Sequence, residues 1–411
     1  MLSKKIIIET HAYNASKTIE RTIQSVLAQT HQNWEWHLFE NGSTDDGATW
    51  EIIQKYAAKE PRIKTYQCVY NNPLNTYLFL AREAGLKQNI NNYFTYICAD
   101  DTFEPEFMSH MLAFQQENKL DIVSCTSKYT DAVSGELLNK FFLQQSVVIS
   151  TPQEYSDKFS LFYSFYREMW GHLISFRILS KLSHYNYLKY FLEYSYSFLA
   201  LMLDILNVTD RVGILAKPLH NYYISKTSLA FQSVMRNSRL VHFESLCEKL
   251  RYFLLQKCGY ISMDNEIFIL NRYAKTIYDY LPTAISCEDD VQKLLFLVRI
   301  VRFKSTTQVF ESELVPQELK SDFCNKISEW LTNAVQNKKF NKPRVIGDKS
   351  GVFDYYASDS LMSEFQYQVT DFYKINNSIE IADNSIEIVG NNTKPLIKFI
   401  LELETFIRKY T

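Results

Sequence analysis

The stretch KIIIETHAYNASKTIERTIQSVLAQTHQNWEWHLFENGSTDDG, residues 5–47, decides the fold. It begins with an isoleucine run that is typical of a strand buried on both faces. Residues 16–30 then carry apolar side chains at helical spacing, and residues 34–40 alternate as a strand does. Strand, helix and strand in this order predict a βαβ unit, in which the two strands lie parallel in one sheet.

The same alternation continues through about the first 125 residues. Further helices are predicted at 48–59, 75–88 and 104–118, and further strands at 63–70, 93–99 and 121–127. Ligands of such sheets bind beyond the carboxyl ends of the strands. Three polar loops lie at those ends, namely residues 11–16, 41–47 and 100–102. Their convergence predicts a binding site at that edge of the sheet.

The composition argues against several other classes of protein. The 44 basic and 46 acidic residues give no bulk attraction to nucleic acid, so no nucleic-acid partner is expected. Seven cysteines without a CxxC pair offer neither a disulfide framework nor a structural zinc site, and fit reduced thiols in the cytoplasm. No apolar run approaches the roughly 18 residues of a transmembrane helix. The first turn, HAYNASK, lacks the glycines that an NAD or FAD fold needs.

Taken together, several segments resemble family 2 glycosyltransferases of the GT-A fold, over roughly residues 4–230. The first three matches are Tyr13-Asn14, Ser25-Val26-Leu27-x-Gln29-Thr30 and Gly42-Ser43-Thr44-Asp45. The later matches are LAREAGL (80–86), YICADDTFEPEF (96–107), MWGHLISFRIL (169–179) and LHNYYISKTSLA (219–230). Each match is weak alone, but their shared order makes the resemblance specific. Nothing after about residue 240 is covered.

The resemblance implies an α/β fold, a Rossmann-like mixed sheet of GT-A type with flanking helices. We expect a nucleotide-sugar-binding half at 1–125 and an acceptor-binding half at 126–231. A mostly helical region at 232–340 and a C-terminal region at 341–411 would follow. The tandem heptads SIEIADN and SIEIVGN (378–391) predict a β-hairpin, and residues 394–409 a final helix.

The activity implied by the resemblance is inverting transfer of a hexosyl or N-acetylhexosaminyl group from a nucleoside diphosphate, with UDP favoured. The acceptor would be a hydroxyl of a saccharide, a lipid-linked saccharide or a protein, in cell-surface glycan or glycoprotein assembly. Mn²⁺ or Mg²⁺ would neutralise the departing diphosphate. The protein would work in the cytoplasm, at the inner face of the membrane.

The acidic pair Asp100 and Asp101 is the predicted metal site. The resemblance makes Asp101 the metal ligand and places Asp100 against the ribose or the metal. The alternative is a solvated acidic turn that caps the next helix. Cys98 departs from the family, because many relatives carry a further Asp at that position.

Nucleotide binding is assigned, by the same resemblance, to the first two loops and one helix. Tyr13 would stack on the base, and His11 would line the pocket. Glu40 and Asn41 occupy the place of an acidic pair, and the Asn41 carbonyl can still accept from uracil. The alternative for Tyr13 is a half-buried loop aromatic. Arg82 would contact the diphosphate, or else is a solvated helix arginine.

Glu193 is the predicted catalytic base, although Tyr194 stands where the family has an Asp. A neutral tyrosine, with a pKa of about 10, is a poor base near pH 7. Either Glu193 takes that role, or Asp204 or another acid does, or the chain is not an ordinary enzyme. Trp170 is the candidate acceptor contact. The aromatic residues of 155–200 could instead pack between the sheet and the helices.

Two other function classes remain open from the sequence. One is a catalytically degenerate scaffold that binds nucleotide or glycan, or supports a partner enzyme. The other is a nucleotidyltransferase, which HAYNASK disfavours because it has no glycine and one lysine. The basic run at 337–344 could touch a membrane surface or form a solvated linker. Residues 347–351 resemble a phosphate loop only weakly, and the C-terminal region is large enough to form a homo-oligomer.

Overall fold

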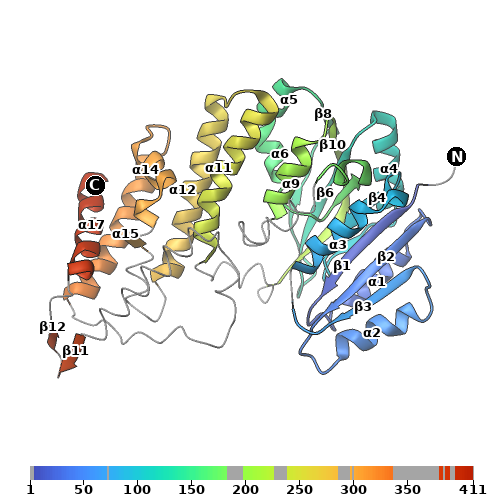
Figure 1. Ribbon diagram of the computed structural model, residues 1–411, viewed down its shortest axis with the longest axis horizontal. Helices are drawn as coiled ribbons and strands as arrows, with labels where there is room; N and C mark the ends of the chain where they lie inside the picture. The colour runs from blue at the N-terminus through green and yellow to red at the C-terminus, as the bar shows by residue number, and fades with distance from the viewer. Residues whose placement is uncertain are drawn as a thin grey trace. The chain divides into compact units, whose positions relative to one another are not determined.

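The computed structural model describes residues 4–71, 74–182, 198–225, 238–285, 297–298, 300–336, 379–382, 385–388 and 394–410. The chain divides into two compact units. The first is built mainly from the residues before 229 together with 252–261, and the second from 229–251 and the residues after 261 (Figure 1). In the described part, no helix is long and apolar enough to cross a membrane.

A mixed sheet of ten strands forms the first unit. One half is parallel and has the order β3-β2-β1-β4. These strands are β1 (Ile6–Ala12), β2 (Trp34–Asn41), β3 (Ile63–Cys68) and β4 (Tyr93–Tyr96). The isoleucines of β1 are fully or almost fully buried, as the run predicted.

Strand β9 (His172–Ser175) joins the two halves of the sheet, because it pairs antiparallel with both β4 and β6. Strand β6 (Ile122–Asp131) then lies parallel to the long strand β10 (Val212–Ile224). Short strands border this half, namely β5 (Thr102–Phe103), β7 (Leu137–Phe141) and β8 (Val147–Ile149). Strand β10 therefore runs beside the segment that follows β4.

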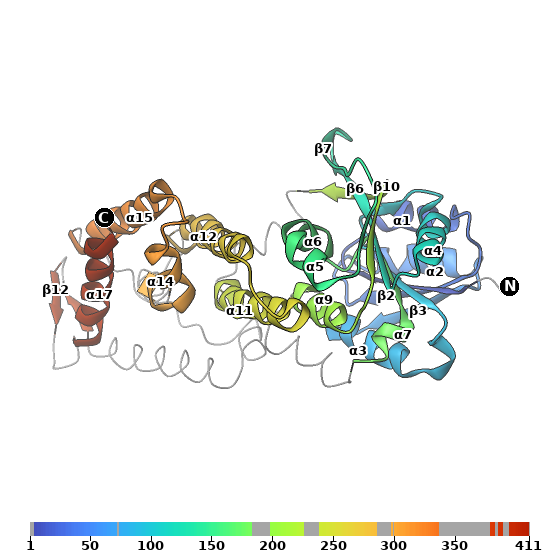
Figure 2. The same cartoon turned by 90° about the horizontal axis from the view of Figure 1, so that it is seen from above.

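Helices cover both faces of the sheet, which is close to edge-on in Figure 2. On one face α1 (Ile19–Leu27), α2 (Ala48–Ala57) and α4 (Phe107–Asn118) share one apolar core with β1 and β2, and α4 packs on β6 and β10. On the other face lies α3 (Leu74–Gly85), whose Phe79 contacts His37 and Phe39. The remaining elements are η1 (Lys87–Asn89), α5 (Pro152–Asp157), α6 (Phe159–Tyr166), α7 (Phe176–Leu179) and α9 (Phe198–Asn207).

The predicted fold class is confirmed, and the predicted elements differ from the structure mainly at their ends. The strand predicted to reach residue 99 ends at Tyr96, because the chain then turns. The helix predicted from Glu104 begins at Phe107. The backbone N–H of Glu104 donates to the carbonyl of Leu219 in β10 at 2.9 Å, so this residue extends the sheet contact and not the helix.

The second unit is mostly helical, with the predicted hairpin near its end. The chain enters it through α11 (Ser238–Cys258), whose last turns belong to the first unit. Its other elements are α12 (Met263–Ile285), α14 (Lys304–Glu311), α15 (Gln317–Gln336), β11 (Ile379–Ala382), β12 (Ser385–Ile388) and α17 (Lys394–Tyr410). Phe406 of α17 packs on Phe310 with ring centroids 4.8 Å apart. The segments 337–344 and 347–351 lie outside the described residues.

Candidate functional site

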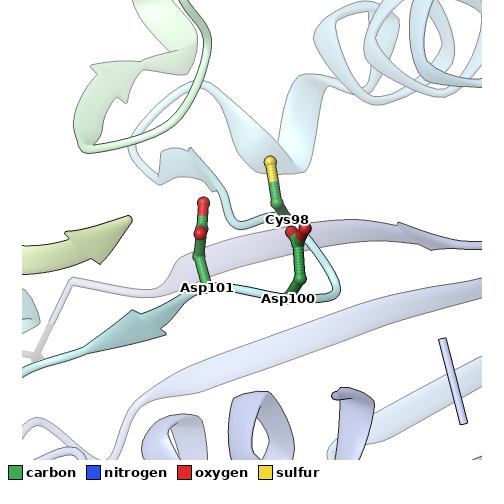
Figure 3. Close-up of side chains that lie close together, drawn as sticks. All are labelled: Cys98, Asp100 and Asp101. Atoms are coloured by element: carbon green, nitrogen blue, oxygen red, sulfur yellow. The ribbon is translucent and has the colours of Figure 1, made fainter. Parts of the chain in front are cut away.

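A tight acidic turn follows β4 at the carboxyl edge of the parallel strands. The backbone N–H of Asp101 donates to the carbonyl of Cys98 at 3.2 Å and closes the turn. The side chains of Cys98, Asp100 and Asp101 extend to the same side of this turn (Figure 3). One ligand atom of each residue lies within 4.8 Å of the other two. The turn thus gathers three groups that bind cations.

Asp101 is fully buried and only partly satisfied. Its Oδ1 accepts from the backbone N–H of Tyr223 in β10 at 3.1 Å. Its Oδ2 lies 3.3 Å from Nε2 of His220, yet within the described residues neither of these two atoms has a hydrogen-bond partner. Since buried polar atoms are nearly always paired, the arrangement fits a cation beside Oδ2.

His220 is itself held in a fixed place. It is fully buried, and its Nδ1 lies 3.1 Å from Oγ of Ser127 in β6. Trp170 stacks on its ring, with centroids 4.6 Å apart and an interplanar angle of 18°. Strand register therefore fixes Nε2 toward the carboxylate of Asp101.

Burial makes the acidic turn costly to ionise. The pKa of Asp100 rises to about 6, because the carboxyl is buried and the charge of Asp101 is adjacent. The pKa of the Cys98 thiol also rises well above its usual value, through burial first and then through both carboxylates. Arg21 donates to the backbone carbonyl of Asp100 at 2.6 Å. A bound divalent cation would reverse these pKa shifts, so the residues fit such an ion.

The loops that follow β1 and β2 are locked to each other. Asn14 has a φ of 50°, and its backbone N–H donates to Oγ of Ser43 at 2.9 Å. Its side-chain oxygen accepts from the backbone N–H of Thr44 at 2.8 Å. Glu40 is buried, and its Oε1 accepts from the backbone N–H of Ser43 at 2.6 Å. The polar groups of these loops thus set the loop shape, with Tyr13 half-buried among them.

Asn41 and His11 lie deeper, at the ends of β2 and β1. Asn41 is buried, and its amide donates to Oδ1 of Asn71 at 2.8 Å. Burial lowers the pKa of His11 to about 3, so its ring is neutral. This ring lies 2.6 Å from Oε1 of the buried Glu9 and stacks on Phe39. The side chain of His11 therefore belongs to a polar network on the face of the sheet.

Arg82 is exposed in the last turn of α3. Its guanidinium donates to Oε1 of Glu83 at 2.9 Å, and Glu83 also accepts from the side chain of Asn89 at 2.8 Å. Its charge is therefore partly offset by a neighbouring carboxylate.

Trp170 lies next to the acidic turn. It forms a parallel bridge with Tyr96, the last residue of β4, and stacks on Tyr222 at 5.3 Å as well as on His220. Glu193 and Tyr194 lie outside the described residues, whereas Asp204 is half-buried in α9.

Three residues of the site were missed by the reasoning from sequence. They are Arg21, Ser127 and His220. For His220 a signal exists, since a histidine inside an apolar strand needs a polar partner. The partner, however, is set by the pairing of β10 with β5 and β6, which the sequence does not reveal.

A comparison with protein families finds a match over the part of the chain that contains this site. Residues 8–176 match the family described as glycosyl transferase family 2. The matched part of the chain includes Tyr13, the acidic turn and Trp170. The helical second unit lies outside the match.

Curated relatives are similar over a stretch of comparable length. The chain is 34% identical over 142 residues to "UDP-Glc:alpha-D-GlcNAc-diphosphoundecaprenol beta-1,3-glucosyltransferase WfaP" of Escherichia coli. The aligned residues cover 34% of the length of this chain and 50% of the length of that protein. It is 31% identical over 140 residues to "Putative teichuronic acid biosynthesis glycosyltransferase TuaG" of Bacillus subtilis, 33% of this chain and 51% of that protein. The chain thus spans about half the length of these relatives.

Solved structures overlap more of the chain, at low similarity. TarS of S. aureus, residues 1–349 in complex with UDP-GlcNAc, gives 16% identity and a TM-score of 0.44, covering 94% of this chain and 97% of that one. The mannosyltransferase PcManGT of Pyrobaculum calidifontis, in complex with GDP-Man and Mn²⁺, gives 10% identity and a TM-score of 0.43, covering 81% and 88%.

Proposed function

We propose that the protein is a metal-dependent, inverting glycosyltransferase. It takes a sugar from a nucleoside diphosphate, with UDP favoured, and passes it to a hydroxyl of a saccharide, a lipid-linked saccharide or a protein. The observation that carries the proposal is the acidic turn at the end of β4. Its buried Asp101 has one oxygen without a hydrogen-bond partner among the described residues. The turn also lies within residues 8–176, which match glycosyl transferase family 2.

The metal would be held by Asp101 and Asp100. Mn²⁺ or Mg²⁺, when bound, supplies charge neutralisation of the departing diphosphate. The Tyr223 N–H fixes one oxygen of Asp101, and His220 faces the other, so this carboxylate needs no reorientation to bind. Asp100 loses its proton more easily once the cation is present.

The nucleoside would bind against the locked loops. Tyr13 stacks on the base, while Asn41 and Glu40 shape the pocket wall at the end of β2. Hydrogen bonds to Asn71 and to the Ser43 N–H hold these two side chains in place, which favours a preformed pocket. His11 stays neutral and packs behind the pocket wall, with its ring stacked on Phe39 of β2. Arg82 contacts the diphosphate or the nucleotide.

Trp170 is the proposed acceptor contact, since it lies beside the acidic turn through Tyr96 and His220. A lipid-linked acceptor is supported by the name of the WfaP relative, whose substrate is a sugar diphosphoundecaprenol. Such an acceptor places the protein in the cytoplasm at the inner face of the membrane. Glu193 is the proposed base that takes the proton of the acceptor hydroxyl.

A survey of donors tests the proposal. The full chain with Mn²⁺ is incubated with UDP-, GDP- and CDP-sugars and crude cell glycans, and release of nucleoside diphosphate is measured. We expect turnover with one donor class. Asp101→Ala should abolish it, while Asp157→Asn, an exposed acid on α5, should leave it unchanged. Absence of turnover with every donor would contradict the proposal.

A catalytically degenerate scaffold is the second candidate, favoured by Tyr194 at the place of the usual acid. It would bind a nucleotide-sugar in the presence of Mn²⁺ without releasing the nucleotide. Calorimetric binding without turnover in the donor survey therefore separates the two functions.

A further inference from the structure

The thiol of Cys98 lies beside the two carboxylates of the candidate metal site. It lies on the same side of the turn as Asp100 and Asp101, with its Sγ in the cluster whose atoms lie within 4.8 Å of one another (Figure 3). The chain's other described cysteines do not join such a cluster. Cys125, Cys247 and Cys324 are buried in the apolar core.

We propose that Cys98 is a ligand of the divalent cation, so that the site combines a thiolate with carboxylates. This inference rests on the proposed function of the acidic turn, but it concerns which ion the turn selects. A sulfur ligand favours borderline and soft ions, such as Co²⁺, Zn²⁺ and Cd²⁺, over Mg²⁺. The site would therefore discriminate against Mg²⁺, which prefers oxygen ligands.

The distances in the turn are close to those of one shared ion. A metal–sulfur bond is about 2.3 Å and a metal–oxygen bond about 2.0–2.2 Å, so two donors on opposite sides of an ion lie roughly 4.5 Å apart. The observed limit of 4.8 Å is only slightly larger. Small side-chain rotations would bring Sγ and the carboxylate oxygens onto one ion.

The unpartnered Oδ2 of Asp101 is a second, independent indication of a ligand. This atom is buried, and its residue is fully enclosed. The Tyr223 N–H holds the other oxygen of the same carboxylate, so the orientation of Oδ2 is fixed by β10. A cation bound by Cys98 and Asp101 would give Oδ2 of Asp101 a partner, which this atom lacks within the described part of the protein.

Ligation displaces the proton of the Cys98 thiol. Binding breaks the S–H bond, forms the sulfur–metal bond and releases one proton to solvent. The thiolate then carries the single negative charge that an aspartate would carry at this position.

Cobalt absorption tests the proposal directly, because thiolate ligation gives Co²⁺ a near-ultraviolet charge-transfer band that carboxylates do not give. The reduced, metal-free full chain is titrated with CoCl₂. We expect the band in the wild type, its loss in Cys98→Ser, and its retention in Cys258→Ser, a half-buried cysteine at the end of α11. Cobalt affinity should fall at least about tenfold in Cys98→Ser, a loss that even supporting residues of metal sites produce.

A second variant checks the selectivity. Cys98→Asp should lose the cobalt band and bind Mg²⁺ more tightly than the wild type does. Alkylation of the wild type needs no variant: iodoacetamide should modify Cys98 more slowly with saturating Zn²⁺ than without it, as measured by peptide mass mapping.

The proposal is overturned if the wild type gives no thiolate band, if the band persists in Cys98→Ser, or if Zn²⁺ leaves alkylation of Cys98 unchanged. Binding of a nucleotide-sugar measured on the same samples keeps this result apart from the proposed function. Metal-dependent nucleotide binding without the band refutes the role of Cys98 alone. The band without any nucleotide binding refutes the glycosyltransferase and leaves the thiolate site standing.

Discussion

The acidic turn after β4 and the paired loops after β1 and β2 lie at the same edge of the sheet, but they differ in how far their polar groups are hydrogen-bonded. In the loops, Asn14, Glu40 and Ser43 are hydrogen-bonded to one another or to neighbouring backbone. In the turn, Oδ2 of Asp101 is left unpaired and the pKa of Asp100 is raised. The polar groups of the loops have hydrogen-bond partners without a ligand. In the turn, without a cation, Oδ2 of Asp101 has no hydrogen bond within the described residues and Asp100 is difficult to ionise.

The largest effect is expected at Asp101. Asp101→Asn keeps an acceptor for the Tyr223 N–H but removes the charge that would hold the metal. Turnover should fall at least about a hundredfold, as losing one group that stabilises a transition state typically does. The metal-free variant should be about 1 kcal/mol more stable than the wild type, because a neutral amide replaces a fully buried carboxylate of which one oxygen has no hydrogen bond in the described part of the chain. Turnover measurements and urea unfolding check both expectations, and a variant that is both active and less stable would contradict them.

Gly42 tests the loops. Its φ is 71°, and a Cβ there would lie 2.4 Å from backbone atoms of Tyr70. Gly42→Ala should therefore cost about 2–4 kcal/mol of unfolding free energy, from the left-handed backbone and the overlap together. Gly135→Ala is the control, because its φ is 72° with no atom near the added Cβ, and it should cost about 1 kcal/mol. Equal losses in the two variants, measured by urea unfolding, would show that the close approach is unimportant.

Acid titration tests the turn. The pKa of Asp100 is about 6 in the folded protein and 3.8 in the reference state, so the folded state favours the protonated carboxyl. The contribution of Asp100 to the free energy of unfolding is therefore fully present below pH 3.8 and is lost as the pH rises through 6. The metal-free protein should lose up to about 3 kcal/mol across this window on account of Asp100. Asp100→Asn should remove that component, and saturating Mn²⁺ should reverse it. Thermal unfolding at several pH values measures the slope, and identical slopes in wild type and variant would refute the raised pKa.

The smallest effect is expected at Asn14. Asn14→Gly keeps the positive φ but removes the side-chain contact with Thr44, and should cost about 1 kcal/mol. Asn14→Ala loses the contact and also strains the backbone, so it should cost more. Chemical unfolding of the two variants gives the comparison, and a larger loss for glycine would contradict it.

The fold was predictable from sequence where hydrophobic periodicity is strong. The isoleucine run forms β1, the helix predicted at 16–30 forms over Ile19–Leu27, and the strand predicted at 34–40 forms over Trp34–Asn41, since each contains its own pattern. The short strand β5 and the antiparallel strand β9 carry no such pattern, because pairing across the sheet defines them.

The candidate site was predictable in its residue types but not in its contacts. Adjacent acids at a strand end indicated Asp100 and Asp101, and the resemblance to family 2 glycosyltransferases indicated Trp170. That Asp101 faces His220 depends on β10, more than 100 residues later in the chain. The depth of Asp101 and the raised pKa of Asp100 likewise follow from packing, which one sequence does not encode in any local pattern.

The central claim is that the acidic turn needs a divalent cation to bind a nucleoside diphosphate. Calorimetric titration of UDP into the metal-free full chain, with and without Mn²⁺, tests it most directly, and Asp101→Asn is titrated alongside. We predict binding with Mn²⁺ that is lost both without the ion and in Asp101→Asn. Binding of UDP that is equal with and without Mn²⁺, or unchanged in Asp101→Asn, would contradict the claim.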